Sequence, residues 1–305
     1  MISIALRPEV YVVAVSGGVD SVALLDILSK QHASQNEIQP TQLIVAHFDH
    51  GIRADSHKDR QFVAKLAKRY GYPFVYGETQ LGSSASEEAA RTARYDFLRK
   101  VKNSVDASII VTAHHQDDAL ETAVFNLLRG TGRHGVVLQE RSGDVWRPLL
   151  PYSKDALLTY AKQRDLKWRE DITNQDTSYS RNYIRNILLK RLTAKQYEEL
   201  NGYVGKVHQI DADIEKYMAH LMHVQPSIHR LDRQQFAGLP HVVAKEFLVY
   251  WLRQNQVYAF DKSTIERLCV AIKTGYPDRQ YDVVHGKAVT LTAQTASLKS
   301  QTRKY

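Results

Sequence analysis

The feature that most constrains the fold is a regular alternation of short apolar runs and longer amphipathic stretches in the first half of the chain. Residues 10–15, 43–48 and 107–112 form apolar runs typical of strands that are buried on both faces. The intervening pattern predicts helices over 22–30, from about 56 to 70, from Ser86 onward and over 117–129, and one more short strand over 72–76. Helices that connect parallel strands cover both faces of their sheet. We therefore predict an α/β fold with a doubly wound parallel sheet.

A second, smaller domain is expected beyond residue 200, where the pattern becomes mainly helical. Helical periodicity covers 207–222, 242–254 and 262–273, the segment 280–292 is typical of a hairpin that turns at His285-Gly286-Lys287, and the polar segment 297–305 is expected to fray. We place the domain boundary near residues 200–206, around Asn201-Gly202 and Gly205. A chain of 305 residues has room for two domains, and we predict a catalytic domain over 1–204 and a smaller, mainly helical domain over 205–305.

The net charge of +8 is distributed unevenly along the chain. Residues 1–150 carry 17 basic and 17 acidic side chains, whereas the remainder carries 24 against 16. Such an asymmetry is typical of a catalytic half joined to a half that meets a polyanion. The plain alternative is a well-solvated basic surface.

Cysteine content and hydropathy exclude several classes of protein. One cysteine, Cys269, cannot build a disulfide framework, a cysteine-based zinc cluster or a CxxC redox pair. No apolar run approaches the roughly 20 residues that span a bilayer. The N-terminal segment shows neither a basic region nor a cleavage site, and we expect a cytoplasmic protein with no membrane contact.

A glycine-containing loop directly follows the first predicted strand and opens the first predicted helix. Its sequence is Ser16-Gly17-Gly18-Val19-Asp20-Ser21. Glycines at this place let backbone N–H groups turn toward a phosphate, and the helix N-terminus adds the positive end of its dipole. Asp20 is a candidate for holding Mg²⁺ or for positioning a leaving pyrophosphate. The loop is neither a Walker A motif nor GxGxxG, and an ordinary Gly-Gly turn is the structural alternative.

Acidic residues and histidines follow the strand predicted over 107–112, at the same edge of the sheet. The segment is His114-His115-Gln116-Asp117-Asp118, with Glu121 one turn further on. Asp118 and Glu121 share one helical face, where they could bind a cationic amine, coordinate Mg²⁺ or accept a proton. Plain helix-start chemistry is the alternative for either Asp117 or Asp118.

Further candidates are His47, His50 and Arg53 after the second strand, and Arg94 on the helix that begins at Ser86. Two clusters of histidine and aspartate could indicate a metal-dependent phosphohydrolase, but that reading leaves the glycine loop unexplained. Arg94 either pairs with an acid on its own helix or reaches developing negative charge at a nucleotide. Spacing alone leaves both choices open.

The glycine loop resembles the SGGxDS signature of the PP-loop ATP pyrophosphatases, and the motifs together resemble the tRNA(Ile)-lysidine synthetase family. The matching segments are VSGGVDS, VAHFDHGIR, TAHHQDDALET, the stretches 93–98, 129–132, 146–150 and 170–174, and RNYIRN at 181–186. They cover about residues 10–192. The loop at 133–137 and residues 172–174 differ from the residues usual at these places in the family, and the helical C-terminal part matches only loosely.

This resemblance implies that ATP, with Mg²⁺, adenylylates the C2 oxygen of the wobble cytidine in an isoleucine tRNA with a CAU anticodon, and that free lysine then displaces AMP. It implies that the loop from Ser16 to Ser21 binds ATP, that Asp20 and Arg94 act at adenylylation, and that Asp118 and Glu121 bind and deprotonate lysine. Arg181, Asn182 and Arg185 are then expected to face the anticodon loop or its phosphates, and the domain over 205–305 is expected to bind tRNA. A homodimer is left open. The rival within the superfamily, a cytidine thiolase acting on tRNA, needs sulfur-carrying cysteines, and Cys269 fits better as an apolar core residue.

Overall fold

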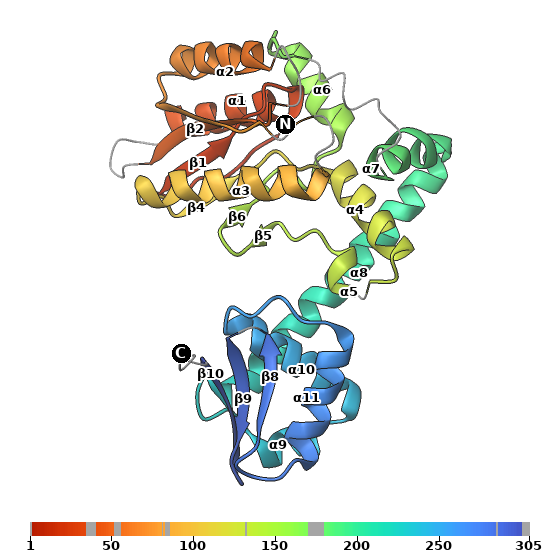
Figure 1. Cartoon of the computed structure of the whole chain (residues 1–305). Helices are drawn as coiled ribbons and strands as arrows, with labels where there is room; N and C mark the ends of the chain where they lie inside the picture. The colour runs from red at the N-terminus through yellow and green to blue at the C-terminus, as the bar shows by residue number, and fades with distance from the viewer. Residues whose placement is uncertain are drawn as a thin grey trace. The chain divides into compact units, whose positions relative to one another are not determined.

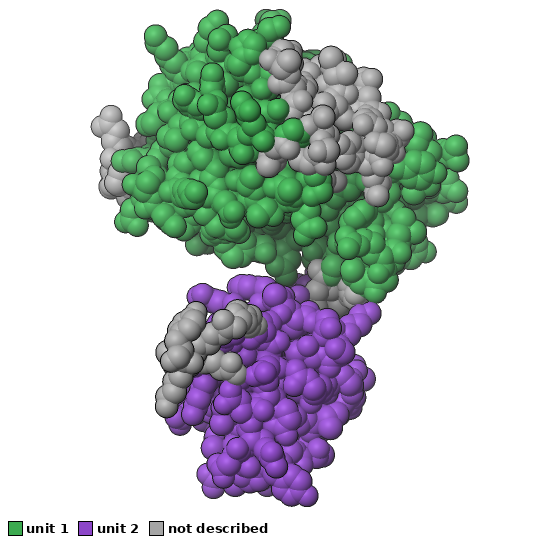
Figure 2. All heavy atoms as spheres, viewed as in Figure 1, with its two compact units in different colours: residues 1–207 green, residues 208–305 purple. Residues whose placement is uncertain are grey.

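The computed structural model describes residues 2–34, 41–51, 56–80, 82, 86–131, 133–169, 180–284 and 286–300. The chain divides into two compact units, Met1–Val207 and His208–Tyr305 (Figure 2). No helix among the described residues is long and apolar enough to cross a membrane.

A six-stranded sheet organises the first unit (Figure 1). Its strands are β1 (Val10–Ala14), β2 (Gln42–Asp49), β3 (Phe74–Glu78), β4 (Ile109–Val111), β5 (Arg141–Ser142) and β6 (Val145–Trp146), in the spatial order β3-β2-β1-β4-β6-β5. Strands β1 to β4 and β6 pair in parallel, and β5 runs antiparallel to β6. Val13 of β1 lies opposite Val45 on one side and Val111 on the other, so β1 is central to the sheet.

Helices cover both faces of this sheet because successive side chains of a strand point in opposite directions. The helices are α1 (Val19–Ser34), α2 (His57–Tyr70), α3 (Glu87–Ser104), α4 (Gln116–Leu128), α5 (Arg133–Val136) and α6 (Lys154–Gln163). Tyr11 and Val13 of β1 belong to the core formed with α1, α2 and α6, whereas Val12 packs into the core formed with α3. Figure 1 shows α1, α2 and α6 on one side of the strands and α3 on the other. The predicted doubly wound sheet is confirmed.

The predicted strands and helices of the first 130 residues are present, with shifts of a few residues at their ends. Ser86 caps α3 as expected, since its Oγ accepts the Ala89 N–H at 3.1 Å. The strand predicted over 72–76 begins later, at Phe74. Gly71 ends α2 in the left-handed conformation, and the Tyr72 N–H is still bonded to Ala67 in the last turn of that helix.

Three short helical segments and the start of a long helix complete the first unit. They are α7 (Ser180–Tyr183), the π-helical turn η2 (Ile184–Leu188), the 3₁₀ turn η3 (Leu189–Arg191) and α8 (Ala194–His223). Val204 of α8 packs with Leu120 and Ala123 of α4 and with Val136 of α5 in a small separate core. The sequence pattern had not predicted α5, α6 or the turn from α7 to η3.

Gly202 and Gly205, around which we place the domain boundary, lie inside the helix α8. Glycine lowers helix propensity by about 1 kcal/mol, a weak preference that tertiary packing can override. Leu200, Val204 and Val207 supply that packing on the inner side of the helix. The two compact units divide between Val207 and His208, within this helix.

The second unit combines helices with a small antiparallel sheet. Besides the end of α8 it contains β7 (Arg230–Asp232), α9 (Arg233–Gly238), α10 (His241–Gln254), α11 (Lys262–Thr274), β8 (Gln280–Val284), β9 (Lys287–Leu291) and β10 (Thr295–Ser300). The strand order is β7-β10-β9-β8. The predicted helices and the β8–β9 hairpin are confirmed, and the fully buried Cys269 packs in the core with Trp251 and Phe247 as expected of an apolar residue.

The predicted frayed end is wrong for residues 297–300, which belong to β10 between β7 and β9. The strand alternates, with Ala296 fully buried and Leu298 packed against the core, while polar side chains separate them. That period of two is a strand signal hidden in a segment that is polar on average. Residues 301–305 lie outside the described residues.

Candidate active site

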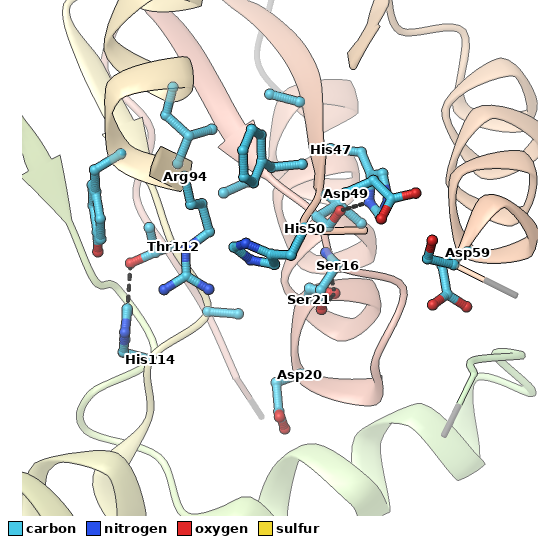
Figure 3. Close-up of a pocket in the computed structure, with 18 of the residues that line it drawn as sticks. Ser16, Asp20, Ser21, His47, Asp49, His50, Asp59, Arg94, Thr112 and His114 are labelled. Carbon is cyan, nitrogen blue, oxygen red and sulfur yellow. Dashed lines mark hydrogen bonds between the residues drawn. The ribbon is translucent and has the colours of Figure 1, made fainter. Parts of the chain in front are cut away.

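A cavity of about 390 Å³ lies at the carboxyl ends of β1, β2 and β4 (Figure 3). Open α/β sheets bind their ligands at this edge. The polar lining consists of Ser16, Asp20, Ser21, His47, Asp49, His50, Ser56, Asp59, Arg94, Tyr95, Thr112, His114 and Asp118. The fold therefore brings the glycine loop, the segment after β2, Arg94 and the acidic segment after β4 to one cavity.

Hydroxyl groups hold the glycine loop in shape. Ser21 Oγ accepts the N–H groups of Ser16 and Gly17, both at 3.2 Å, and donates to the Gly18 carbonyl at 2.9 Å. Ser16 Oγ accepts the Gly18 N–H at 3.3 Å. Gly17 has φ +98°, a conformation that L side chains rarely adopt. Val19 begins α1, so the loop ends at a helix N-terminus as predicted.

Asp20, in the first turn of α1, contacts the side chains of Lys154 and His115. Lys154 Nζ lies 2.7 Å from its Oδ1 and 2.6 Å from its Oδ2, and His115 Nε2 lies 3.7 Å from Oδ2. Burial alone would raise the pKa of Asp20, but the nearby His115 and the Lys154 charge outweigh it and lower that pKa. The carboxylate is therefore ionised, which is the form that binds a cation.

The acidic segment places its two predicted lysine ligands differently. Asp118 lines the cavity, and its Oδ2 accepts the His115 N–H at 2.9 Å at the start of α4. Glu121 lies one turn deeper, with its side chain 3% exposed. Burial raises the pKa of Glu121, although the charges of Arg185 and Arg181 act in the opposite direction.

Both arginines predicted to meet tRNA bind these acids. Arg185 Nη2 lies 2.6 Å from Glu121 Oε2 and 3.3 Å from Asp118 Oδ1. Arg181 Nη1 lies 3.3 Å from Glu121 Oε1. Asn182 is half-buried beside Arg181 on α7. Arg185 lies on the π-helical turn η2, a type of turn frequent at functional sites.

Asp117 differs from Asp118 in its contacts. Its Oδ2 accepts the backbone N–H of Lys154 at 3.1 Å, and its Oδ1 accepts the hydroxyl group of Tyr197 on α8. Asp117 is not among the residues that line the cavity. Asp117 thus connects α4 with α6 and α8, whereas Asp118 lines the cavity.

The histidines of the site are mostly held by neighbours. His47 Nδ1 donates to the Val15 carbonyl at 2.9 Å, and burial lowers the pKa of His47. His114 Nδ1 is 2.8 Å from Thr112 Oγ1, and burial, followed by the Arg147 and Arg94 charges, holds the pKa of His114 well below its usual value. His50 lines the cavity with its ring edge-on to Phe48. Arg53 lies outside the described residues.

Sequence reasoning missed Lys154, the partner of Asp20. The two residues are 134 positions apart, so no spacing rule connects them. The available signal was weaker: Ser153 followed by Lys154 and Asp155 is a helix start, and Ser153 Oγ does accept the Ala156 N–H at 3.2 Å. It also missed Asp59, which lines the cavity, and its ion-pair partner Arg169, whose backbone N–H donates to the Gly17 carbonyl at 3.0 Å.

A phosphate-binding loop at the carboxyl edge of a parallel α/β sheet defines a nucleotide-binding protein of the PP-loop class. The family model described as a PP-loop domain matches residues 5–192, and the chain belongs to this family.

Comparison with individual proteins shows which PP-loop proteins this chain is similar to. A tRNA(Ile)-lysidine synthase of Thermus thermophilus is 43% identical over 180 residues, which are 57% of this chain and 34% of that protein. One from Legionella pneumophila is 32% identical over 271 residues, which are 84% of this chain and 60% of the relative. The chain thus spans 34% to 60% of the lengths of these two relatives. A solved U34-tRNA thiolase of Methanococcus maripaludis shares the fold, with a TM-score of 0.50 and 17% identity, over 67% of this chain and 74% of that one.

Proposed function

We propose that this protein converts the wobble cytidine of an isoleucine tRNA with a CAU anticodon to lysidine, using ATP and free lysine. One observation carries the proposal: the phosphate loop and Asp118 line the same cavity, with Glu121 one helical turn behind Asp118. An activated base and a cationic nucleophile must meet in such a site. The likeness to the tRNA(Ile)-lysidine synthases supports the choice of substrates.

In the first step, the cytidine C2 oxygen attacks the α-phosphorus of ATP and pyrophosphate leaves. The loop from Ser16 to Ser21 and the N-terminus of α1 would hold the phosphates, and Arg94 would face the charge that develops at the α-phosphate. Asp20 would hold Mg²⁺, whose charge assists departure of pyrophosphate. A metal here needs phosphate oxygens as further ligands, since no group of three metal-binding side chains occurs in the described part of the chain.

In the second step, the ε-amine of lysine attacks C2, the C2–O bond breaks, and AMP leaves with that oxygen. A protonated amine is not a nucleophile, so the site must bind the ammonium group and then accept a proton. Asp118 and Glu121 are the proposed groups. The raised pKa of the Glu121 carboxyl suits a proton acceptor, and the guanidinium groups that now bind it mark a site for a cation.

Recognition of tRNA is proposed for Arg181, Asn182 and Arg185 together with the basic surplus after residue 150. Phosphate groups of the anticodon loop would compete with Asp118 and Glu121 for the two arginines. Lysine would then take the place that the guanidinium groups leave. A cytoplasmic location stays a prediction, and a homodimeric assembly stays open.

The thiolase alternative has less support from the residues. The likeness to a U34-tRNA thiolase concerns the fold alone. Cys269 is fully buried in the core of the second unit, and burial raises the pKa of its thiol, which makes it a poor sulfur carrier. The phosphohydrolase alternative needs a protein-built metal cluster, and the described residues contain none.

The test is lysine transfer to two transcripts. The protein is incubated with Mg²⁺, ATP, labelled lysine and isoleucine tRNA transcripts that differ only in a CAU or GAU anticodon. Incorporation confined to the CAU transcript supports the proposal. Absence of label from both transcripts, with a folded protein that binds ATP, contradicts it.

A further inference from the structure

The ammonium group of Lys154 lies against both oxygens of the Asp20 carboxylate, at 2.7 and 2.6 Å. Lys154 is the first residue of α6, and Asp20 lies in the first turn of α1 and lines the cavity. The side chains are 35% and 26% exposed, so solvent reaches the pair. An ion pair in contact with solvent contributes little to stability, so its lysine can exchange one anionic partner for another at small cost.

The pair is not needed to dock α6 onto α1, because a separate buried contact does this. Asp26 of α1 accepts the hydroxyl group of Tyr160 at 2.6 Å and Arg164 Nε at 3.3 Å, both from α6 or its end. Leu157 and Ala161 of α6 are fully buried in the same core. The Lys154–Asp20 contact lies apart from this core, at the cavity.

The backbone of Lys154 is held independently of its side chain. Its N–H donates to Asp117 at 3.1 Å, and the neighbouring Ser153 caps α6. Asp117 is in turn bound by the Tyr197 hydroxyl group. The side chain can therefore change partner while its Cα stays in place.

We propose that Lys154 is a phosphate-binding residue of the ATP site, which neutralises Asp20 before nucleotide binds and moves its ammonium group onto the β- or γ-phosphate when ATP arrives. Both Asp20 oxygens are engaged by Lys154, so a cation can bind Asp20 directly only after this contact opens. The freed ammonium group then lies beside the glycine loop, where phosphate charge is greatest. Lysine serves such sites as a mobile point charge.

This inference rests on the proposed function only in that the loop binds ATP. The test is calorimetric titration of the full chain with ATP, once in EDTA and once in Mg²⁺. Lys154→Met is expected to weaken ATP binding in EDTA by about tenfold or more, the loss of one charge-assisted contact. Lys154→Arg should restore most of the affinity. Lys162→Met, which removes an exposed lysine from the same helix, should bind ATP as the native chain does.

ATP affinity of Lys154→Met within about twofold of the native value, with or without a lower melting temperature, would overturn the proposal, because a merely structural pair predicts that outcome. If Lys154→Met does not fold, Asp20→Asn combined with Lys154→Met is compared with Asp20→Asn alone. The combined variant should then bind ATP in EDTA about tenfold more weakly, and equal affinities would overturn the proposal. These titrations need neither tRNA nor lysine. A native chain that binds ATP but modifies no tRNA would contradict the proposed function and leave this inference standing.

Discussion

Arg185 binds the buried carboxylate of Glu121 through two nitrogen atoms, with Nε 2.8 Å and Nη2 2.6 Å from Oε2. The acid that we assign to lysine and the arginine that we assign to tRNA therefore neutralise each other in this structure. When a phosphate draws Arg185 away from Glu121, another cation must take the place of the guanidinium group, because an unpaired charge on the buried Glu121 would be costly. Binding of a phosphate to Arg185 and of an ammonium group to Glu121 are thus expected to favour each other.

Arg185→Met tests this coupling. Without the guanidinium group, the lysine ammonium group has one competitor fewer at Glu121, and lysine KM is expected to fall several-fold. The tRNA KM is expected to rise about tenfold through loss of one phosphate contact. Steady-state kinetics with each substrate varied in turn measures both values, and Lys65→Met on the exposed side of α2 is the control. Changes of both KM values in the same direction would contradict the coupling.

Substitutions of Asp117 and Asp118 are expected to affect different properties of the protein. Asp118→Asn keeps an oxygen for the His115 N–H but loses the charge at the cavity, so lysine transfer should fall by about 100-fold or more with little loss of stability. Asp117→Ala removes the acceptor for Lys154 and Tyr197 and should lower the free energy of unfolding by about 2 kcal/mol. Urea unfolding and single-turnover lysine transfer separate the two. An Asp118→Asn protein with native transfer would exclude Asp118 from the reaction.

Gly17→Ala is expected to damage both stability and ATP binding. A Cβ would meet only ordinary contacts with Phe62 and Val63, but the φ of +98° strains any L side chain by about 1–2 kcal/mol. Gly71, at the end of α2, has φ +76°, so Gly71→Ala imposes the same kind of backbone strain. The added Cβ would meet no heavy atom within 4 Å. Both variants should therefore lose stability, whereas only Gly17→Ala should lose ATP affinity. Equal ATP affinity in the two variants would argue against phosphate binding by this loop.

The buried His47 should make stability depend on pH. Its pKa is lowered from 6.5 in the fold, so as the pH falls below about 6.5 the unfolded chain takes up a proton that the folded chain does not. Native stability should therefore decrease toward acid through this group, and between about pH 7.5 and about pH 5.5 the free energy of unfolding should fall less for His47→Gln than for the native protein. Urea unfolding at the two pH values measures the difference. His115, whose pKa is raised, has the opposite effect on the pH dependence of stability. This effect is the same in the native protein and in His47→Gln, so it cancels in their comparison.

The strands and helices of the first unit were predictable because their apolar period is strong and local. The continuity of α8 was not, since two glycines in its sequence are outweighed by packing of Val204 against a core that only the tertiary structure assembles. Strand β10 was not predicted because the segment is polar on average, which hides the alternation that places Ala296 and Leu298 in the core.

For the site, the rule that parallel strands end at one edge was enough to predict that Ser16, Asp20 and Asp118 share a cavity. The pairing of Lys154 with Asp20 needed the fold itself, because the partners come from distant helices. Spacing also could not separate the roles of Asp117 and Asp118. Adjacent residues of a helix point in directions that differ by about 100°, and only the contacts in the folded protein show which of the two faces the cavity.

The most direct measurement is the identity of the nucleoside at the wobble position after reaction. The CAU transcript is incubated with the protein, Mg²⁺, ATP and lysine, digested to nucleosides and analysed by mass spectrometry, with AMP and pyrophosphate measured in parallel. We predict one cytidine whose mass has increased by one lysine minus one water, with one AMP and one pyrophosphate formed for each modified tRNA. An unmodified cytidine despite ATP consumption, or a cytidine that has exchanged oxygen for sulfur in the presence of a sulfur donor, would contradict lysidine formation.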